Sequence, residues 1–323
     1  MTRFRALLAT LRIANAPSVV SNVWLGYMLG WSYWGGGAEL NGDLTKLITI
    51  GLCLYFAGNL ANDWFDHEWD KEHRPERALP SGLFSPFTYI VSAAFLSING
   101  ILAAATISHS VLYSALAILI LILVYTFLHK RTRWAVIPMG LCRAGLYVMG
   151  FLAVFTKSTE IGTSPGVALN LGDYSRAWAY VSTHALGLLI YIAGLSLAAR
   201  YESVEHPPHG MVILSRAMLF LPLAAMSAWW MFYYPVAATI GLIPFAIWLY
   251  LSLTRFRKPV PILVSALLAG IPLIDFIAAL PVAISALMPD QTLADRPLLL
   301  ATVIVPLAAF VLGRILQRVA PAT

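Results

Sequence analysis

Charged residues are scarce in this chain of 323 residues. Only 15 residues are Asp or Glu and 21 are Lys or Arg, so charged side chains make up 11 % of the sequence, whereas 59 % of it is hydrophobic. So little charge excludes a soluble globular domain. The mean hydropathy of +0.77 is typical of a protein that crosses a membrane several times.

Cysteine is scarcer still, with two residues in the chain. Cys53 and Cys142 lie far apart in sequence without metal-ligand spacing, so we interpret both as small buried apolar residues. The N-terminal apolar run is interrupted by Arg12 and Asn15, which favours a retained first helix over a cleaved signal peptide.

Apolar runs long enough to span a membrane fill most of the sequence, which predicts an all-α integral membrane protein with one domain over residues 1–323. A break at Tyr233-Tyr234-Pro235 divides one long run in two, and without that break nine spans remain instead of ten. The ten predicted segments are 11–33, 44–63, 85–106, 110–128, 134–155, 178–199, 210–232, 235–253, 260–287 and 297–317.

Positive charge predicts the orientation of these spans, because Lys and Arg of short loops stay in the cytoplasm. With a cytoplasmic N-terminus, fourteen of the 21 Lys and Arg residues fall on the cytoplasmic side, together with the acidic residues that follow the second span. The net charge of +6 then reflects topology and anionic lipid, and gives no reason to expect nucleic acid as a partner. The fourteen residues are Arg3, Arg5, Lys71, Arg74, Arg77, Lys130, Arg131, Arg133, Arg200, Arg255, Arg257, Lys258, Arg314 and Arg318.

Six of the fifteen acidic residues lie within residues 59–82, at the end of an apolar segment. On a helix Asp63, Asp66 and Asp70 fall within about 60° of one another, and Asn59 lies one turn earlier in the same sector. Three like charges on one face need a counter-charge. A stripe of oxygen ligands fits Mg²⁺ bridging to a phosphate, and a metal-bound diphosphate fits best.

The alternative is an interfacial helix whose acids face water and pair with Lys71, Arg74 and Arg77. Against it, Asn62, Asp63 and Asp66 begin while the segment is still apolar. Unpaired charge is costly at the hydrocarbon boundary and is usually functional there.

The pattern Asn-Asp-x-x-Asp-x-x-x-Asp, followed by Arg-Pro-x-Arg-x-x-Pro-Ser-Gly, resembles the first aspartate-rich motif of the UbiA superfamily of intramembrane prenyltransferases. The matching residues are Asn62, Asp63, Asp66, Asp70, Arg74, Pro75, Arg77, Pro80, Ser81 and Gly82, and Arg12 with Asn15 resembles the family's Arg-x-x-Asn opening. The resemblance implies a helical bundle around a lipid-open cavity. It also implies an enzyme that binds an isoprenyl diphosphate through Mg²⁺ on catalytic aspartates and transfers the prenyl group to a lipophilic acceptor.

Ionisation of a diphosphate requires cations around the leaving group and a dry space for the carbocation. Arg74, Arg77 and Lys130 are candidates to bind the diphosphate, with Arg131 also available. Tyr125 and the residues after it are similar to the family's Tyr-x-x-x-Lys element, but His129 occupies the Lys position and Lys130 follows it. Anchoring of the cytoplasmic loop is the alternative role for Lys130.

The second aspartate motif of the family is missing. Where the family has Asp-x-x-x-Asp after the sixth span, this chain offers Arg200, Glu202 and Glu205. Glu202, and less strongly Glu205, is a candidate ligand of a second Mg²⁺, with Arg200 on the phosphate; a solvated loop is the alternative. Cys142-Arg143 together with residues 196–202 resembles a divergent UbiA-like subgroup of ebo-type biosynthetic clusters.

Arg143 and Asp275 are the charges deepest in the predicted spans. Each needs a partner inside the bundle. The two residues either pair with each other, or Arg143 reaches a cavity and binds diphosphate or an acidic acceptor.

Two other functions remain open. The absence of second-motif aspartates leaves room for a non-catalytic isoprenoid or lipid carrier, and Asp63, Asp66 and Asp70 could form the ion site of a transporter. Transporters usually have paired broken helices near the midplane, whereas these acids gather at one membrane face. The prenyl chain length and the acceptor are not readable from the sequence.

Overall fold

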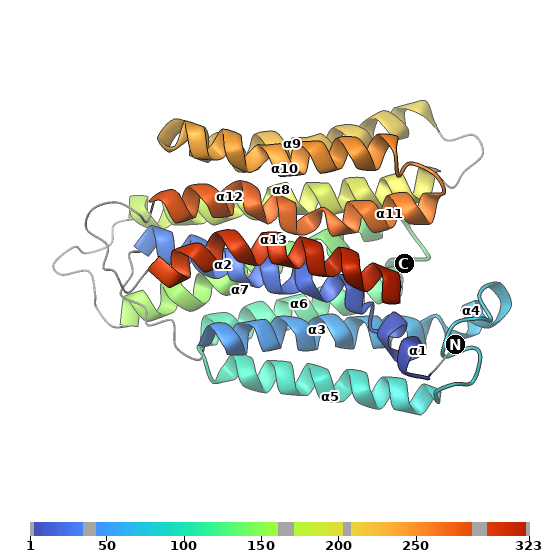
Figure 1. Cartoon of the computed structure of the whole chain (residues 1–323). Coiled ribbons are helices and arrows are strands. Elements are labelled where there is room, and N and C mark those ends of the chain that lie inside the picture. Colours follow the sequence, from blue (N-terminus) through green and yellow to red (C-terminus); the bar gives the residue numbers. More distant parts are fainter. Residues whose placement is uncertain (1–2, 35–42, 161–170, 203–207, 286–295, 321–323) are drawn as a thin grey trace.

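A computed structural model describes residues 3–34, 43–160, 171–202, 208–285 and 296–320. These residues form helices and no strand, as the sequence predicts. Short helices cover the end of the bundle that holds both termini (Figure 1). They are α1 (Arg3–Thr10), η1 (Ile13–Asn15), α4 (His67–His73) and η2 (Arg133–Ala135).

Long helices run side by side along the bundle (Figure 1). They are α2 (Ala16–Trp34), α3 (Asp43–Phe65), α5 (Pro86–Ala105), α6 (His109–Leu128), α7 (Val136–Glu160), α8 (Leu171–Glu202), α9 (His209–Tyr233), α10 (Pro235–Thr254), α11 (Val260–Ala269), α12 (Ile271–Ser285) and α13 (Arg296–Val319).

Within the described residues, nine segments are long and apolar enough to cross a membrane, which makes this a multi-pass membrane protein. They correspond to α3, α5, α6, α7, α8, α9, α10, the pair α11–α12, and α13. The one predicted segment that is not among these nine is the first, 11–33, which corresponds to α2. Its polar residues Ser18, Ser21 and Asn22 lower the mean hydropathy of this helix. It nevertheless packs among α3, α7, α12 and α13.

Local sequence signals explain several helix ends. Ser85 and Ser108 cap α5 and α6, each accepting a hydrogen bond from the backbone N–H three residues later. The break predicted at residues 233–235 is real, because α9 ends at Tyr233 and Pro235 begins α10.

Two irregularities were not predicted. The first predicted span begins later than expected, because Arg12 adopts a left-handed conformation (φ 46°) between α1 and η1. The span predicted over 260–287 is divided at Gly270. There Trp248 Nε1 donates to the carbonyl of Ala266 (2.8 Å) and Tyr191 OH donates to that of Leu267 (2.7 Å).

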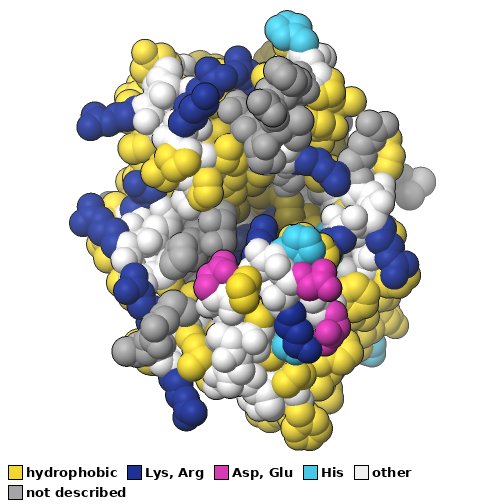
Figure 2. Space-filling model, turned by 90° about the vertical axis from the view of Figure 1, so that its right-hand side faces the viewer, with side chains coloured by type: hydrophobic (Ala, Val, Ile, Leu, Met, Phe, Trp, Pro, Cys, Tyr) yellow, Lys and Arg dark blue, Asp and Glu magenta, His cyan; other side chains and the backbone are white. Residues whose placement is uncertain are grey.

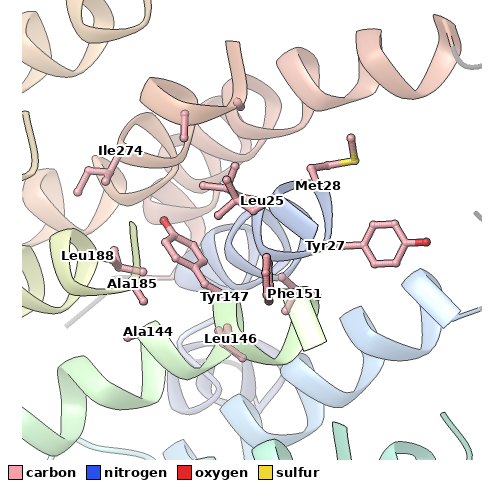
Figure 3. Close-up of a cluster of buried hydrophobic side chains, with 14 of the residues drawn as sticks. Leu25, Tyr27, Met28, Ala144, Leu146, Tyr147, Phe151, Ala185, Leu188 and Ile274 are labelled. Carbon is pink, nitrogen blue, oxygen red and sulfur yellow. The ribbon is translucent and has the colours of Figure 1, made fainter. Parts of the chain in front are cut away.

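Helices α2 and α7 approach each other more closely than side chains allow. A Cβ atom added to Gly150 would lie 2.6 Å from the backbone nitrogen of Tyr27, and Gly26 lies equally tight against the backbone of Tyr147. Figure 3 shows the buried cluster at this crossing, to which Leu25 of α2, Phe151 of α7 and Ile274 of α12 belong. Small residues that let backbones approach are typical of helix packing in membranes.

Candidate active site

An apolar cavity of about 590 Å³ lies between α2, α3, α6, α7, α8 and α11, and we call it the inner chamber. Figure 2 shows the hollow from the end that carries α4, with hydrophobic side chains inside it and charged side chains around its rim. Its apolar lining includes Val19, Leu54, Ile118, Ile122, Leu146, Ile192, Leu195, Leu268 and Ile271.

A second cavity of about 830 Å³ continues from the inner chamber, and we call it the mouth. Five Lys and Arg residues line the mouth against one acid, Asp66. This excess of positive charge favours a strongly anionic ligand. The lining consists of Arg12, Asn62, Asp66, Trp69, Arg74, Arg77, Tyr125, His129, Lys130 and Arg200, and all but Asp66, Trp69 and Lys130 also line the inner chamber.

The acidic segment keeps helical spacing across the junction of α3 and α4. The backbone N–H of Asp66 donates to Asn62 O (3.0 Å), and that of Asp70 donates to Asp66 O (2.8 Å). Side chains four residues apart therefore share one side of the chain, as the sequence predicts for this stripe.

Asp66 is paired with two basic side chains that follow α6. His129 Nε2 lies 3.0 Å from Asp66 Oδ2, and Lys130 Nζ lies 2.9 Å from Oδ1. Burial of the Asp66 carboxyl opposes its ionisation, but the hydrogen bonds from His129 and Lys130 outweigh burial and lower its pKa below the ordinary value. Lys130 also lies 3.9 Å from the ring centroid of Trp69.

Asp63 and Asp70 do not line either cavity; both contact Arg77. Arg77 Nη1 lies 2.8 Å from Asp70 Oδ2 and 3.7 Å from Asp63 Oδ1. Asp63 also contacts Arg12 Nη2 at 3.3 Å, and Arg12 Nη1 donates to Asn59 Oδ1 at 2.9 Å. Repulsion along the acidic stripe is thus balanced by arginines. The solvated alternative fits only Lys71, which pairs with exposed Glu68 (2.8 Å).

The oxygen atoms near the mouth have the chemistry that Mg²⁺ prefers. Asn62 Oδ1 and Asp70 Oδ1 are buried and have no hydrogen-bond partner among the described residues, and Asp66 lies one turn from each. Oxygen atoms of this kind fit a hard divalent cation. In the described part of the chain, however, no three His, Cys, Asp or Glu side chains converge on one point, because Arg77, His129 and Lys130 hold the carboxylates.

All eight predicted substrate-binding residues line the two cavities. Asn15, Asn59 and Arg143 line the inner chamber, Lys130 lines the mouth, and Asn62, Arg74, Arg77 and Arg200 line both. Glu202 ends α8, but its side chain and the whole of Glu205 lie outside the described residues.

Three members of this site were missed as ligand-contacting candidates: Arg12, Tyr125 and His129. Arg12 carried a usable signal, because it is a charge inside an apolar run, three residues before Asn15. Its contact with Asp63 depends on the left-handed turn at Arg12, which has no sequence signature here.

The deep charges Arg143 and Asp275 do not form an ion pair, so of the two alternatives direct pairing is wrong, and Arg143 lines the inner chamber. Arg143 Nη1 donates to Ser18 Oγ (3.0 Å) and to Asn22 Oδ1 (3.2 Å). Asn22 Nδ2 in turn donates to both oxygens of Asp275 at 3.0 Å. The Asn22 amide therefore separates the two charges.

The sequence profile of the UbiA prenyltransferase family matches residues 19–261. The chain belongs to this family. The match includes the acidic stripe, the loop with His129 and Lys130, and α7 with Arg143.

Known UbiA-related proteins resemble this chain to different extents. A digeranylgeranylglyceryl phosphate synthase of Methanothrix thermoacetophila is 40 % identical over 91 residues, which cover 28 % of this chain and only 34 % of that relative. The apo structure of a UbiA homologue from Aeropyrum pernix covers 80 % of this chain and 94 % of that one, with 17 % identity and a TM-score of 0.60. This likeness shows the UbiA fold.

Mg²⁺ occurs in another UbiA structure. A UbiA homologue from Archaeoglobus fulgidus was solved bound to DMAPP and Mg²⁺; that structure covers 97 % of this chain and 99 % of its own, with 14 % identity and a TM-score of 0.42.

Proposed function

We propose that this UbiA-family protein transfers a prenyl group from an isoprenyl diphosphate to a lipophilic acceptor in a Mg²⁺-dependent reaction. The observation that carries the proposal is the continuity of an apolar inner chamber with a mouth of five Lys and Arg residues and Asp66. An isoprenyl diphosphate has this same division between a long apolar chain and a concentrated negative charge.

The mouth supplies the contacts for the diphosphate. Arg74, Arg77, Lys130 and Arg200 face it with charged donors, and arginine forks match phosphate oxygens. Mg²⁺ held by Asp66, Asp70 and Asn62 would neutralise charge on the diphosphate as it leaves. Asp63, between Arg12 and Arg77, would be a further ligand once those arginines bind phosphate.

This arrangement implies an exchange of partners on binding. The aspartates now paired with Arg77, His129 and Lys130 would be released to Mg²⁺, and the cations to phosphate oxygens. Because each charge trades one partner of opposite sign for another, none is left unpaired in a partly buried site.

Prenyl transfer breaks one bond to the prenyl carbon and forms another. The bond between the prenyl carbon and the diphosphate oxygen breaks, and its electron pair stays on the diphosphate. An electron pair of the acceptor forms the new bond to carbon, and the acceptor loses a proton. The apolar walls of the inner chamber exclude the water that would otherwise capture the carbocation.

We infer the orientation of the site in the membrane from its charges. The fourteen Lys and Arg residues predicted to be cytoplasmic belong to α1, to α4, to the segments after α4, α6 and α10, and to the C-terminal ends of α8 and α13. These parts of the chain lie at the α4 end of the bundle (Figure 1), so we place the mouth and both termini in the cytoplasm. Cysteines introduced at Ser81 and Thr254 should label from the cytoplasm. Labelling of Ser81 from outside would invert this orientation.

A reconstituted assay tests the function. The purified protein in lipid nanodiscs is given isoprenyl diphosphates of different lengths and lipid-soluble acceptors from an extract, with Mg²⁺ or with EDTA. Diphosphate release and a prenylated product that both require Mg²⁺ support transfer. Tight binding of the isoprenyl diphosphate without release of diphosphate in every combination would instead support the carrier. If no acceptor stimulated the release of diphosphate, the enzyme assignment would be overturned.

A further inference from the structure

Arg143 differs from every other arginine of the cavities. Arg12, Arg74, Arg77 and Arg200 line both the mouth and the inner chamber, whereas Arg143 lines the inner chamber alone. No Asp or Glu of the described residues lines that chamber. Arg143 therefore brings a positive charge to the inner chamber away from Asp66, the acid that lines the mouth.

The guanidinium of Arg143 is hydrogen-bonded on the side that faces away from the inner chamber. Its hydrogen bonds to Ser18 and Asn22 both use Nη1, and neither acceptor lines the chamber. The Tyr55 ring, whose centroid lies 5.3 Å from Arg143 Cζ, supports it from the side. In the described chain Nη2 and Nε make no hydrogen bond, so two donors remain for a ligand.

Asp275 is not the anionic partner of these two Arg143 donors. It is fully buried and accepts hydrogen bonds from Ser21, Tyr147 and Asn22, so its oxygens are occupied. It does not line the chamber. Through the Asn22 amide it orients Arg143 without neutralising it by contact.

We propose that Arg143 binds the anionic group of the acceptor, a carboxylate or a phosphate, inside the inner chamber. This deepens the proposed function and rests on it. An arginine in an apolar cavity is costly unless an anion joins it, and its planar fork favours a ligand with two oxygens. The donor's diphosphate binds at the mouth, so an acceptor anchored at Arg143 meets the prenyl carbon from the opposite side.

The test compares anionic probes with neutral analogues of similar shape on the full-length protein in nanodiscs. Benzoate is compared with benzamide, and phenyl phosphate with phenol, by calorimetric titration, which needs no turnover. The wild-type protein should bind at least one anion about tenfold more tightly than its neutral analogue, because a charge-assisted pair is worth that much. The preferred anion identifies the acceptor as a carboxylate or a phosphate.

Arg143→Gln should weaken the binding of the preferred anion about tenfold, which abolishes its preference over the neutral analogue, and should change the affinity for the neutral analogues far less. Arg143→Lys should retain part of it, because lysine keeps the charge but loses the fork. Arg314→Gln is the matched control, since Arg314 belongs to α13, stacks on Trp248 and lines neither cavity. A folding defect would weaken anionic and neutral probes alike, so the ratio reports on the contact itself.

Equal binding of anions and neutral analogues to the wild-type protein would overturn the proposal. So would an Arg143→Gln variant that loses affinity for inorganic diphosphate as strongly as for the preferred anion, because Arg143 would then serve the donor. Anion binding that depends on Arg143, together with absence of prenyl transfer, would count against the proposed function instead.

Discussion

The two charged regions of the molecule solve the problem of burial in opposite ways. Along the acidic stripe, the carboxylates contact basic side chains directly: Asp66 contacts His129 and Lys130, and Asp70 contacts Arg77. In the bundle interior, Asp275 is surrounded by neutral donors, and Asn22 stands between it and Arg143. Direct ion pairs can exchange partners with an incoming ionic ligand, whereas a carboxylate saturated by neutral donors is fixed in place.

The comparison is tested most strongly by neutralising one carboxylate at the mouth. Asp66→Asn should lower prenyl transfer by on the order of 10²-fold, because the metal loses a charged ligand at the leaving group. Its melting temperature in detergent without Mg²⁺ should change little, since the amide oxygen still accepts a hydrogen bond from Lys130 and the amide nitrogen can donate to the Nε2 atom of a neutral His129. Retained turnover, or a loss of stability like that of a core variant, would show Asp66 to be structural.

The opposite result is expected in the interior. Asp275→Leu should destabilise the protein by about 1–3 kcal/mol for each buried donor left without an acceptor, because Ser21, Asn22 and Tyr147 all donate to this carboxylate. Thermal unfolding in detergent measures the change, and Asp275→Asn, which keeps one acceptor oxygen, should be milder. A stable Asp275→Leu variant would refute the fixed role of this cluster.

A smaller effect is expected at Glu202, and it tests whether the metal site extends from the acidic stripe to the end of α8. If Glu202 binds a second Mg²⁺, Glu202→Gln should raise the Mg²⁺ concentration for half-maximal activity several-fold, because one carboxylate ligand is lost. Glu202→Asp should be milder, and Glu205→Gln is the control. An unchanged Mg²⁺ titration would leave the metal site with the first acidic stripe alone.

The smallest effect is expected from an acid of the same segment that faces water. Lys71 donates a hydrogen bond to Glu68 and lowers its pKa, but Glu68 is fully exposed. Such pairs contribute little to stability. Glu68→Gln should therefore change neither the melting temperature nor the activity, and a clear loss in either measurement would extend the functional site along α4.

The sequence predicted the spans well because apolar runs and proline signals are local. Pro235 began a helix where expected, and the division of the last long run at Gly270 was missed because both halves are equally apolar. The acidic stripe and the basic residues Arg77 and Lys130 were predicted by type and spacing, whereas Arg12 and His129 were missed. Which cation meets which acid was not predicted, because the contact of Arg12 with Asp63 depends on how η1 meets α3, 51 residues later.

The close crossing of α2 and α7 at Gly26 and Gly150 has a consequence for how this protein can change over evolutionary time. These helices carry Asn22 and Arg143, and their separation is set by main-chain contact, not by interlocking side chains. The exposed apolar side chains of α5, α6 and α10 carry no such packing constraint. At Gly26 and Gly150 even alanine would push the two helices apart. We therefore expect new acceptor preferences to evolve by substitution of residues that line the inner chamber, while the two glycines stay unchanged.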